Sequence, residues 1–301
     1  MREMVMIEAP AKINLTLDVK GRRPDNYHEI ETVMHQIDLV DRVFLRKKLS
    51  GIKVTTEVAG LADDESNLAY RAAQEFFRHT GIVGGVEIIV EKKIPVGAGL
   101  AGGSTDAAAV IKGLDYLYET GLSLHEMLDV GAKIGSDVPF CILGGTALAR
   151  GRGEILSPLA TDITLTLVLV KPGFSVSTKD VYEGLAAVEI FERPDTEEVV
   201  HGLVANDWEA VCHGMGNVLE AFTTSWFPEV KLIKSRMKER GARAALMSGS
   251  GPSVFGVFKG EREAVEAFNH FRVDYRETYL VKSYRKGEGN DAGEKTYSCE
   301  T

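Results

Sequence analysis

A glycine-rich segment constrains this chain more than any other feature of its sequence. Four glycines lie within seven residues, between Gly97 and Gly103, and Ser104-Thr105-Asp106 follows them as a helix start signal. Apolar residues then recur with helical spacing as far as Tyr118. Glycine allows positive φ angles and a close approach of the backbone to a ligand, and a helix N-terminus presents unpaired N–H groups. The segment therefore predicts a loop that binds the phosphates of a nucleoside triphosphate.

The surroundings of this loop bear on three other interpretations of it. Three of its glycines match the G-x-G-x-x-G spacing of dinucleotide-binding folds, but such a fold requires a second strand, and a helical stretch, 123–134, follows here. No Walker motif is present in the sequence. A tight turn without a ligand remains an alternative. Ser104 and Thr105 are either helix caps or hydroxyl groups offered to a phosphate or to Mg²⁺.

Short strand-like runs alternate with helical stretches along the chain, which predicts an α+β fold. The expected strands are 14–19, 43–46, 52–57, 86–91, 165–170, 254–258 and 278–283. The expected helices are 66–79, 104–118, 123–134, 177–187, 208–213, 228–240 and 261–271. A glycine-rich patch and a polar turn surround Pro158, so we expect one domain over 1–158 and a second over 159–285. Residues 286–301 offer almost nothing to bury and are expected to form a disordered tail.

Composition excludes several classes of function. The 35 basic and 44 acidic residues give a net charge of −9, which argues against a nucleic-acid surface. The three cysteines, Cys141, Cys212 and Cys299, match neither a disulfide framework nor a zinc site. No apolar run reaches the roughly 18 residues that span a bilayer, and the N-terminus lacks a signal-peptide pattern. We expect a cytoplasmic protein that acts on neither nucleic acid nor membranes, and its oligomeric state stays open.

Polar and apolar side chains alternate near the N-terminus. Ile13 and Leu15 alternate with Lys12, Asn14 and Thr16, so the polar side chains share one face of a strand. Lys12 is then either a solvated surface lysine or, with Asn14 on the same side, a group that orients a polar substrate. The spacing leaves both interpretations open.

Further polar segments carry groups suited to binding or catalysis. Tyr27 and His28 lie in a polar turn, where they either stack on and hydrogen-bond a planar heterocycle or form an exposed turn without such a role. Gly135 ends a helix, and Asp137 then serves either as a helix cap or as a carboxylate that accepts a hydroxyl proton. The segment 248–253, rich in glycine and serine, is either a tight turn or a second backbone wall for a ligand.

The order of these segments resembles the GHMP small-molecule kinase superfamily. The motifs that carry the resemblance are Pro-Ala-Lys-Ile-Asn-Leu from Pro10, the glycine-rich loop from Pro95 and the late Gly-Ser-Gly turn. The segments 25–32, 135–140 and 171–178 narrow the resemblance to members that act on a cytidine-diphosphate alcohol in the non-mevalonate isoprenoid pathway.

The resemblance implies both a fold and a reaction. The fold is the two-domain GHMP kinase fold, with an N-terminal ATP-binding α/β domain and a C-terminal ferredoxin-like α+β domain. The reaction is transfer of the ATP γ-phosphate, with Mg²⁺ present, to the 2-hydroxyl of the methylerythritol unit. Lys12 and Asp137 are the implied catalytic pair, and Asn14 would position the alcohol.

The resemblance also implies binding residues for both substrates. Tyr27 and Tyr182 would sandwich the cytosine, and His28 would read its polar edge. Ser104 is a candidate Mg²⁺ ligand. The implied ATP-binding residues are Pro95, Val96, Gly97, Ala98, Gly99, Leu100, Ala101, Gly102, Gly103, Ser104 and Thr105.

Departures from the family pattern are few, and two alternatives to this function remain. Asn26, Ala101 and Thr105 replace the more usual Gly, Gly and Ser; Asn tolerates positive φ better than most residues, and Thr keeps the hydroxyl. The first alternative is another kinase of the superfamily, acting on homoserine or mevalonate, which carry no base to stack on aromatic rings. The second is a nucleotide-binding sensor without catalysis, against which the presence of both Lys12 and Asp137 argues.

Overall fold

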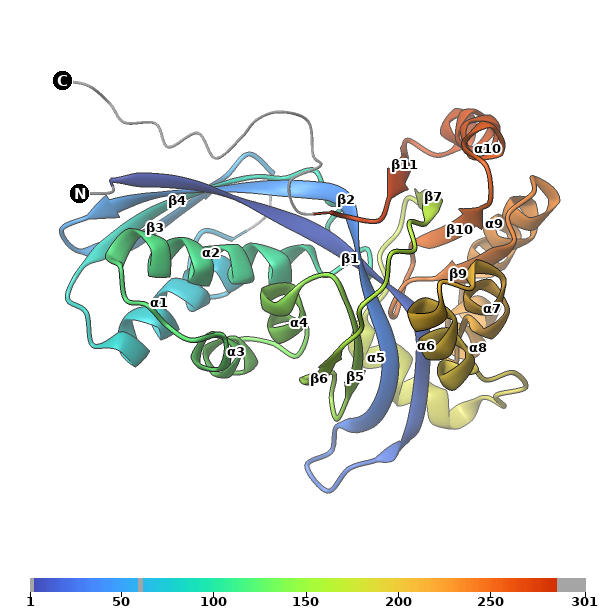
Figure 1. Ribbon diagram of the computed structural model, residues 1–301, viewed down its shortest axis with the longest axis horizontal. Coiled ribbons are helices and arrows are strands. Elements are labelled where there is room, and N and C mark those ends of the chain that lie inside the picture. Colours follow the sequence, from blue (N-terminus) through green and yellow to red (C-terminus); the bar gives the residue numbers. More distant parts are fainter. Residues whose placement is uncertain (1–2, 59–61, 286–301) are drawn as a thin grey trace.

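The residues that the computed structural model describes, 3–58 and 62–285, form two β-sheets, one in each half of the molecule (Figure 1). The tail expected over 286–301 lies outside the described residues. The strands of the first sheet are β1 (Met4–Arg22), β2 (His28–Lys48), β3 (Gly51–Thr56), β4 (Gly85–Glu91), β5 (Thr146–Arg150), β6 (Ile155–Pro158) and β8 (Gly216–Asn217). Their order is β3-β4-β2-β1-β8, and β5 pairs with both β2 and β6. Pairing is antiparallel except between β3 and β4 and between β1 and β8.

Helices cover one face of the first sheet (Figure 1). They are α1 (Leu68–Thr80), α2 (Gly102–Tyr118), α3 (Leu124–Ala132) and α4 (Val138–Leu143). Small residues of α2 let it lie close to the strands, because a Cβ atom at Gly113 would sit only 2.6 Å from Leu45 Cδ1. Helix α2 therefore reaches the sheet without a gap, and its N-terminus is held at a defined place.

The second sheet is antiparallel and has the ferredoxin-like arrangement that was expected. Its strands are β7 (Thr166–Lys171), β9 (Ala244–Met247), β10 (Val254–Phe258) and β11 (Glu277–Lys282), in the order β11-β7-β10-β9. With the helices between them, these strands follow the pattern β-α-β-β-α-β. The helices of this half are α5 (Thr178–Gly184), the 3₁₀ turn η1 (Leu185–Ala187), α6 (Thr196–Ala205), α7 (Trp208–Gly214), α8 (Glu220–Trp226), α9 (Pro228–Glu239) and α10 (Glu261–Asp274). The predicted two-domain α+β fold is confirmed.

The middle of strand β1 is buried on both faces. On one face Ile13 and Leu15 pack with Leu167 and Phe255 of the second sheet, in a core that spans both halves of the molecule. The other face carries Lys12, which is only 4% exposed. The interpretation of Lys12 as a solvated surface residue is therefore wrong, because the polar face of the strand is enclosed.

Several elements differ from the sequence-based expectations. β1 and β2 are far longer than the predicted runs 14–19 and 43–46, because buried polar residues within them interrupt the apolar pattern. The helix predicted over 177–187 ends as α5 at Gly184, and η1 completes it. The patterns did not predict α4, α6, α8, β5, β6, β8 or β9, most of which are too short to show a full period. In the described part of the chain, no helix has both the length and the apolar character that a bilayer crossing demands.

His35 of β2 joins three segments of the fold. Its Nδ1 lies 2.8 Å from Thr146 Oγ1 of β5, and its Nε2 lies 2.8 Å from Ser283 Oγ, just after β11. Ser283 Oγ also accepts the N–H of Leu165 at 2.8 Å. Burial lowers the pKa of His35 to about 4, because no compensating anion stabilises the charged ring among its direct partners. The folded protein therefore holds His35 neutral.

This burial predicts a loss of stability on mild acidification. Because the pKa of His35 is about 4 in the folded protein and about 6.5 when unfolded, only the unfolded chain takes up this proton as the pH falls below 6.5. We expect the free energy of unfolding to fall by about 2 kcal/mol from this group between pH 7 and pH 5. Urea unfolding of the wild type and of His35→Gln at both values measures the difference. Identical pH dependence in the two proteins would contradict the assignment.

Candidate active site

The ammonium group of Lys12 lies at the centre of the candidate site. Its Nζ donates a hydrogen bond to Asn14 Oδ1 at 2.8 Å and lies 3.4 Å from Asp137 Oδ2. Asn14 Nδ2 donates in turn to Thr32 Oγ1 of β2, also at 2.8 Å. A buried ammonium group is tolerated only with such partners, so these contacts hold Lys12 in one position. The structure thus brings together the three residues that the sequence singled out, Lys12, Asn14 and Asp137.

Asp137 occupies the N-cap position of α4, yet its side chain makes no capping hydrogen bond. The first turn of α4 contains Pro139, which has no N–H to be capped. The carboxylate is 38% exposed and faces Lys12. The interpretation of the Asp137 side chain as a simple cap is therefore wrong. A carboxylate that is ion-paired on one side and open to solvent on the other can accept a proton from a bound hydroxyl.

The glycine-rich loop uses positive φ angles before α2 begins. Gly97 and Gly99 have φ angles of +64° and +74°, and Ala101 has +57°. Helix α2 starts at Gly102, with Ala101 as its N-cap, so the prediction that Ser104 or Thr105 caps the helix is wrong. Because Ala101 has no side-chain acceptor, the first N–H groups of the helix are left for a ligand.

The two hydroxyl residues at the start of α2 have different surroundings. Thr105 is buried, and its N–H donates to the Ala101 carbonyl at 2.9 Å. Burial also raises the pKa of the Cys141 thiol to about 12, so this cysteine is an inert buried residue. Ser104 is only half-buried. Of the two hydroxyls, the one on Ser104 is therefore the better placed to meet a ligand.

Acidic and histidine side chains do not form a metal cage in the part of the chain that the structure describes. No group of three or more His, Cys, Asp or Glu residues there could hold an ion. Mg²⁺ in nucleotide sites is usually held by one or two protein oxygens together with substrate phosphates and water. The Ser104 hydroxyl and the Asp137 carboxylate are oxygen donors of that kind, so the residues present fit a metal that arrives with a nucleotide.

Backbone contacts fix the glycine-rich loop between the two halves of the molecule. The N–H of Lys12 donates to the Leu100 carbonyl at 3.1 Å, and Ser248 Oγ donates to the Gly99 carbonyl at 2.9 Å. A Cβ atom at Gly99 would lie 2.2 Å from the Ser248 carbonyl oxygen, so only glycine fits there. The segment 248–253 is a tight turn closed by its own backbone, and it packs directly on the loop.

A buried ion cluster lies behind the loop, and the sequence patterns did not predict it. Lys92 pairs with Asp106 Oδ2 at 2.7 Å and with Asp41. Asp41 Oδ1 also accepts the N–H groups of Lys93 and Ile94, at 2.5 and 2.8 Å. Burial raises the pKa of Asp106 despite its pairing with Lys92. The cluster anchors both ends of the loop, and its members are too far apart in sequence to show as a motif.

Aromatic residues lie on the other side of Asp137. The rings of His28, the first residue of β2, and Tyr182, in α5, have centroids 5.2 Å apart and are tilted by 31°. Burial raises the pKa of Tyr182, and the negative charge of Asp137 raises it further, which places the phenol near the carboxylate. Burial, followed by the charge of Arg22, lowers the pKa of His28. A neutral His28 therefore stands beside Tyr182.

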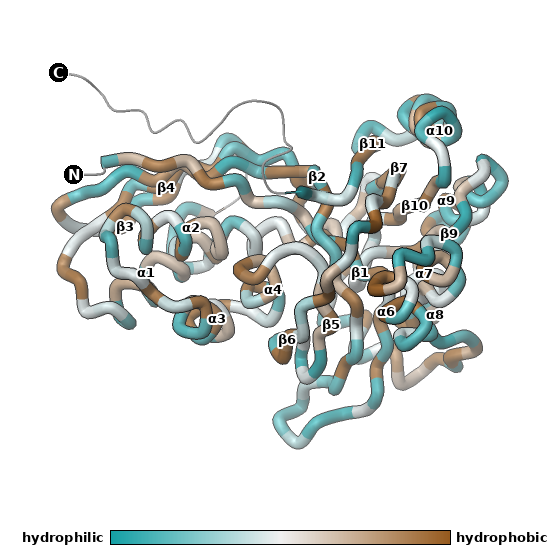
Figure 2. Tube along the Cα trace, viewed as in Figure 1, coloured by the Kyte–Doolittle hydropathy of each residue, from teal (hydrophilic) through white to brown (hydrophobic). Residues whose placement is uncertain are grey.

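Tyr27 lies in the hydrophilic hairpin between β1 and β2 (Figure 2). Its side chain is 54% exposed, and its nearest ring partner is the guanidinium of Arg152, 4.9 Å from the ring centroid. The preceding Asn26 has a φ angle of +68°. A positive φ angle is the conformation expected at a position where the family usually has glycine. The structure thus pairs Tyr182 with His28, while Tyr27 stands one residue away with one face covered by Arg152.

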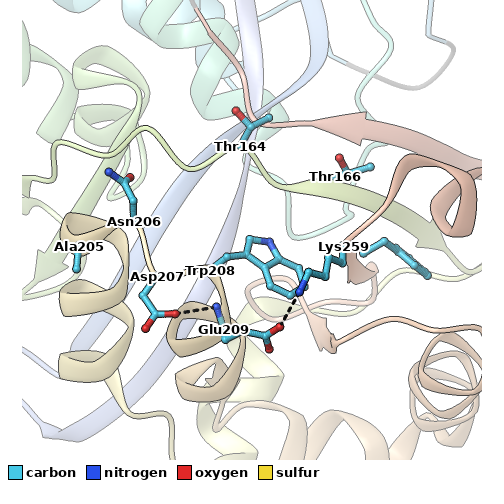
Figure 3. A pocket seen from close by; sticks show the side chains of 9 residues that line it. Thr164, Thr166, Ala205, Asn206, Asp207, Trp208, Glu209 and Lys259 are labelled. Atoms are coloured by element: carbon cyan, nitrogen blue, oxygen red, sulfur yellow. Dashed lines mark hydrogen bonds and ion pairs between the residues drawn. The ribbon is translucent and has the colours of Figure 1, made fainter.

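A shallow cavity of about 440 Å³ lies elsewhere, between α7 and the second sheet (Figure 3). Trp208 forms part of its wall, and Lys259 lies over the Trp208 ring and pairs with Glu209 at 3.4 Å. The residues that line it include none of those predicted for the site. The candidate site is therefore the region around Lys12 and Asp137, not this cavity.

Comparison with known proteins identifies the family. Residues 67–145 match the family model "GHMP kinases N terminal domain", and residues 199–275 match "GHMP kinases C terminal". The 4-diphosphocytidyl-2-C-methyl-D-erythritol kinase of Syntrophomonas wolfei is 48% identical over 284 residues, which cover 94% of this chain and 100% of that protein.

Solved structures give the same result. A crystal structure of 4-(cytidine 5′-diphospho)-2C-methyl-D-erythritol kinase superposes with a TM-score of 0.78 at 36% identity, covering 93% of this chain and all of the other. Homoserine kinase from Cytophaga hutchinsonii reaches a TM-score of 0.76 at only 20% identity, over 94% and 95% of the two chains, and shares the fold alone. The chain therefore belongs to the GHMP kinase superfamily and, within it, to the 4-diphosphocytidyl-2-C-methyl-D-erythritol kinase family.

Proposed function

We propose that this protein transfers the γ-phosphate of ATP to the 2-hydroxyl of 4-diphosphocytidyl-2-C-methyl-D-erythritol. The observation that carries the proposal is the pair formed by buried Lys12 and solvent-open Asp137. This pair stands between the glycine-rich loop, through the Lys12–Leu100 backbone bond, and the rings of His28 and Tyr182. A phosphate donor on one side and a base-carrying acceptor on the other would meet at the carboxylate.

Asp137 orients the acceptor hydroxyl and takes its proton. Such phosphoryl transfers proceed through loose transition states, so placing the hydroxyl in line with the phosphate supplies much of the acceleration. Lys12 pairs with the Asp137 carboxylate and steadies the reacting oxygens. Asn14 positions the alcohol while its side-chain oxygen holds Lys12, and Thr32 fixes the orientation of the Asn14 amide.

The glycine-rich loop holds the ATP phosphates through backbone N–H groups. Gly97 and Gly99 give the loop its positive φ angles, and Gly102, Gly103 and Ser104 present the first N–H groups of α2 to the anion. Ser104 is also the side chain proposed to reach Mg²⁺. When bound, that ion neutralises negative charge on the phosphates.

The acceptor's cytosine is proposed to bind at the aromatic side of the site. Tyr27 and Tyr182 would enclose the base, and His28 would read its polar edge. A neutral His28 has one donor and one acceptor nitrogen, which suits the mixed edge of cytosine. The rings of His28 and Tyr182 are tilted against each other. The base would therefore stack between Tyr27 and Tyr182 only when the acceptor binds.

We also propose a division into two domains and a cytoplasmic location. The boundary at 158/159 coincides with the end of β6 at Pro158. Although β8 crosses back to pair with β1, the strands of the second sheet and the helices that pack on it all follow Pro158 in the chain.

The buried free cysteines, Cys141 and Cys212, suit the proposed location in a reducing cytoplasm.

A substrate panel tests the proposed function against its alternatives. ADP release is measured with ATP, Mg²⁺ and, in parallel, the cytidine-diphosphate alcohol, homoserine or mevalonate. We expect turnover with the cytidine-diphosphate alcohol and none above background with the others. Turnover with homoserine or mevalonate would instead indicate another kinase of the superfamily. ATP binding without any turnover would indicate a sensor.

Replacing Asp137 separates catalysis from nucleotide binding. In Asp137→Asn we expect turnover to fall on the order of a hundredfold or more, because the amide cannot take the hydroxyl proton. The Kd for ATP should stay close to the wild-type value. Asp129→Asn, a change of the same kind at an exposed carboxylate of α3, serves as the control. Near-normal turnover of Asp137→Asn removes this residue from its assigned role.

Replacing Tyr182 tests the base-binding side. In Tyr182→Ala we expect the KM for the cytidine-diphosphate alcohol to rise about tenfold, since base–aromatic stacking contributes about 1–3 kcal/mol. The KM for ATP should not change. Tyr182→Phe keeps the ring and should behave nearly as the wild type. An equal rise in both KM values for Tyr182→Ala would show a general disturbance of the site instead.

A further inference from the structure

Arg152 is placed against Tyr27 by the turn between β5 and β6. Its guanidinium carbon lies 4.9 Å from the centroid of the Tyr27 ring. The turn is tight, because Gly151 and Gly153, which flank Arg152, have φ angles of +72° and +112° that other residues rarely adopt. Tight glycine turns of this kind fix where the intervening side chain leaves the backbone.

The turn is tied to the same hairpin that carries Tyr27. The N–H of Gly151 donates to Glu29 Oε1 at 3.0 Å, and the N–H of Ile30 donates to the Gly151 carbonyl at 2.8 Å. On its other side the turn approaches the catalytic segment, since a Cβ atom at Gly153 would lie 3.9 Å from the carbonyl oxygen of Ser136. The turn that carries Arg152 therefore stands between the start of β2 and the residue that precedes Asp137.

Tyr27 itself has a fixed backbone but an exposed ring. Its N–H donates to Asp25 Oδ1 at 3.1 Å, and its carbonyl accepts the N–H of Arg23 at 2.8 Å. Arg23 directs its own guanidinium to Glu29 and Asp25, at 2.5 and 3.3 Å. The exposed ring of Tyr27 thus has the Arg152 guanidinium over one face, and that guanidinium also pairs with Glu154 Oε1 at 3.5 Å.

We propose that Arg152 is a positioning residue for the acceptor: it holds Tyr27 by one face so that the opposite face receives the base of a nucleoside diphosphate. A guanidinium group is attracted to the face of an aromatic ring and fits the ring plane better than an ammonium group does. Holding the ring in advance removes part of the ordering cost of binding. This inference rests on the proposed function, because it assumes that the acceptor carries a base.

Equilibrium binding of cytidine 5′-diphosphate, measured by titration calorimetry on the full chain without ATP, tests the inference. The proteins compared are the wild type, Arg152→Gln, Tyr27→Ala, the double variant and the control Arg150→Gln. Arg150 lies two residues away, is exposed, and pairs with Glu31 Oε2 at 3.0 Å. The control therefore removes one positive charge from the same strand end without touching Tyr27.

We expect Arg152→Gln to weaken binding about threefold to tenfold, Tyr27→Ala to weaken it at least as much, and Arg150→Gln to leave it unchanged. The double variant should bind no more weakly than Tyr27→Ala, because Arg152 acts through that ring. In steady-state assays Arg152→Gln should raise the KM for the cytidine-diphosphate alcohol and leave kcat and the KM for ATP unchanged. Arg152→Lys should restore part of the loss.

The outcomes separate this inference from the proposed function. Wild-type binding by Arg152→Gln, with binding still weakened in Tyr27→Ala, overturns the role of Arg152 alone. An equal loss from Arg152→Gln in the presence and absence of the Tyr27 ring also overturns it, since Arg152 would then act directly on the ligand. Unchanged binding in Tyr27→Ala overturns the placement of the acceptor, and the inference falls with it.

Discussion

The site depends on one buried positive charge, the ammonium group of Lys12 on β1. Removing such a group from water costs several kcal/mol, which Asn14 and Asp137 offset by accepting its hydrogen bond and pairing with its charge. The backbone of the same residue bonds to Leu100 in the glycine-rich loop. One strand position therefore sets the distance between the phosphate loop and the carboxylate, and any shift of β1 would move both.

Packing between the two halves makes this arrangement rigid. Ile13 and Leu15 of β1 share a hydrophobic core with strands of the second sheet, so the contact between the halves is apolar at this point. At Gly99 and Ser248 backbone meets backbone, and a single Cβ atom would force the halves apart. The contact of Arg152 with Tyr27 is different in kind, because the Tyr27 ring is exposed and Arg152 contacts it on one face.

Sequence patterns predicted long, regular elements well and short or enclosed ones poorly. The helical spacing after the glycine-rich loop correctly predicts α2, although the Ser104 signal misplaced its start by two residues. The alternation at 12–16 correctly predicts a strand with a polar face, but not that this face is enclosed. Short elements such as α4 and β9 show no complete period, and only their contacts with neighbouring elements stabilise them.

The sequence by itself determined the chemical groups and the order of the motifs, because these follow from residue type and local spacing, and the resemblance that those motifs carry implied the two-domain fold. Only the tertiary structure decided which groups meet. Lys12 and Asp137, Lys92 and Asp41, and Arg152 and Tyr27 are pairs separated by tens of residues or more. Their contacts follow from the register of the strands and from packing between the two halves of the molecule. Both depend on residues far apart in the chain, so no short stretch of sequence shows them.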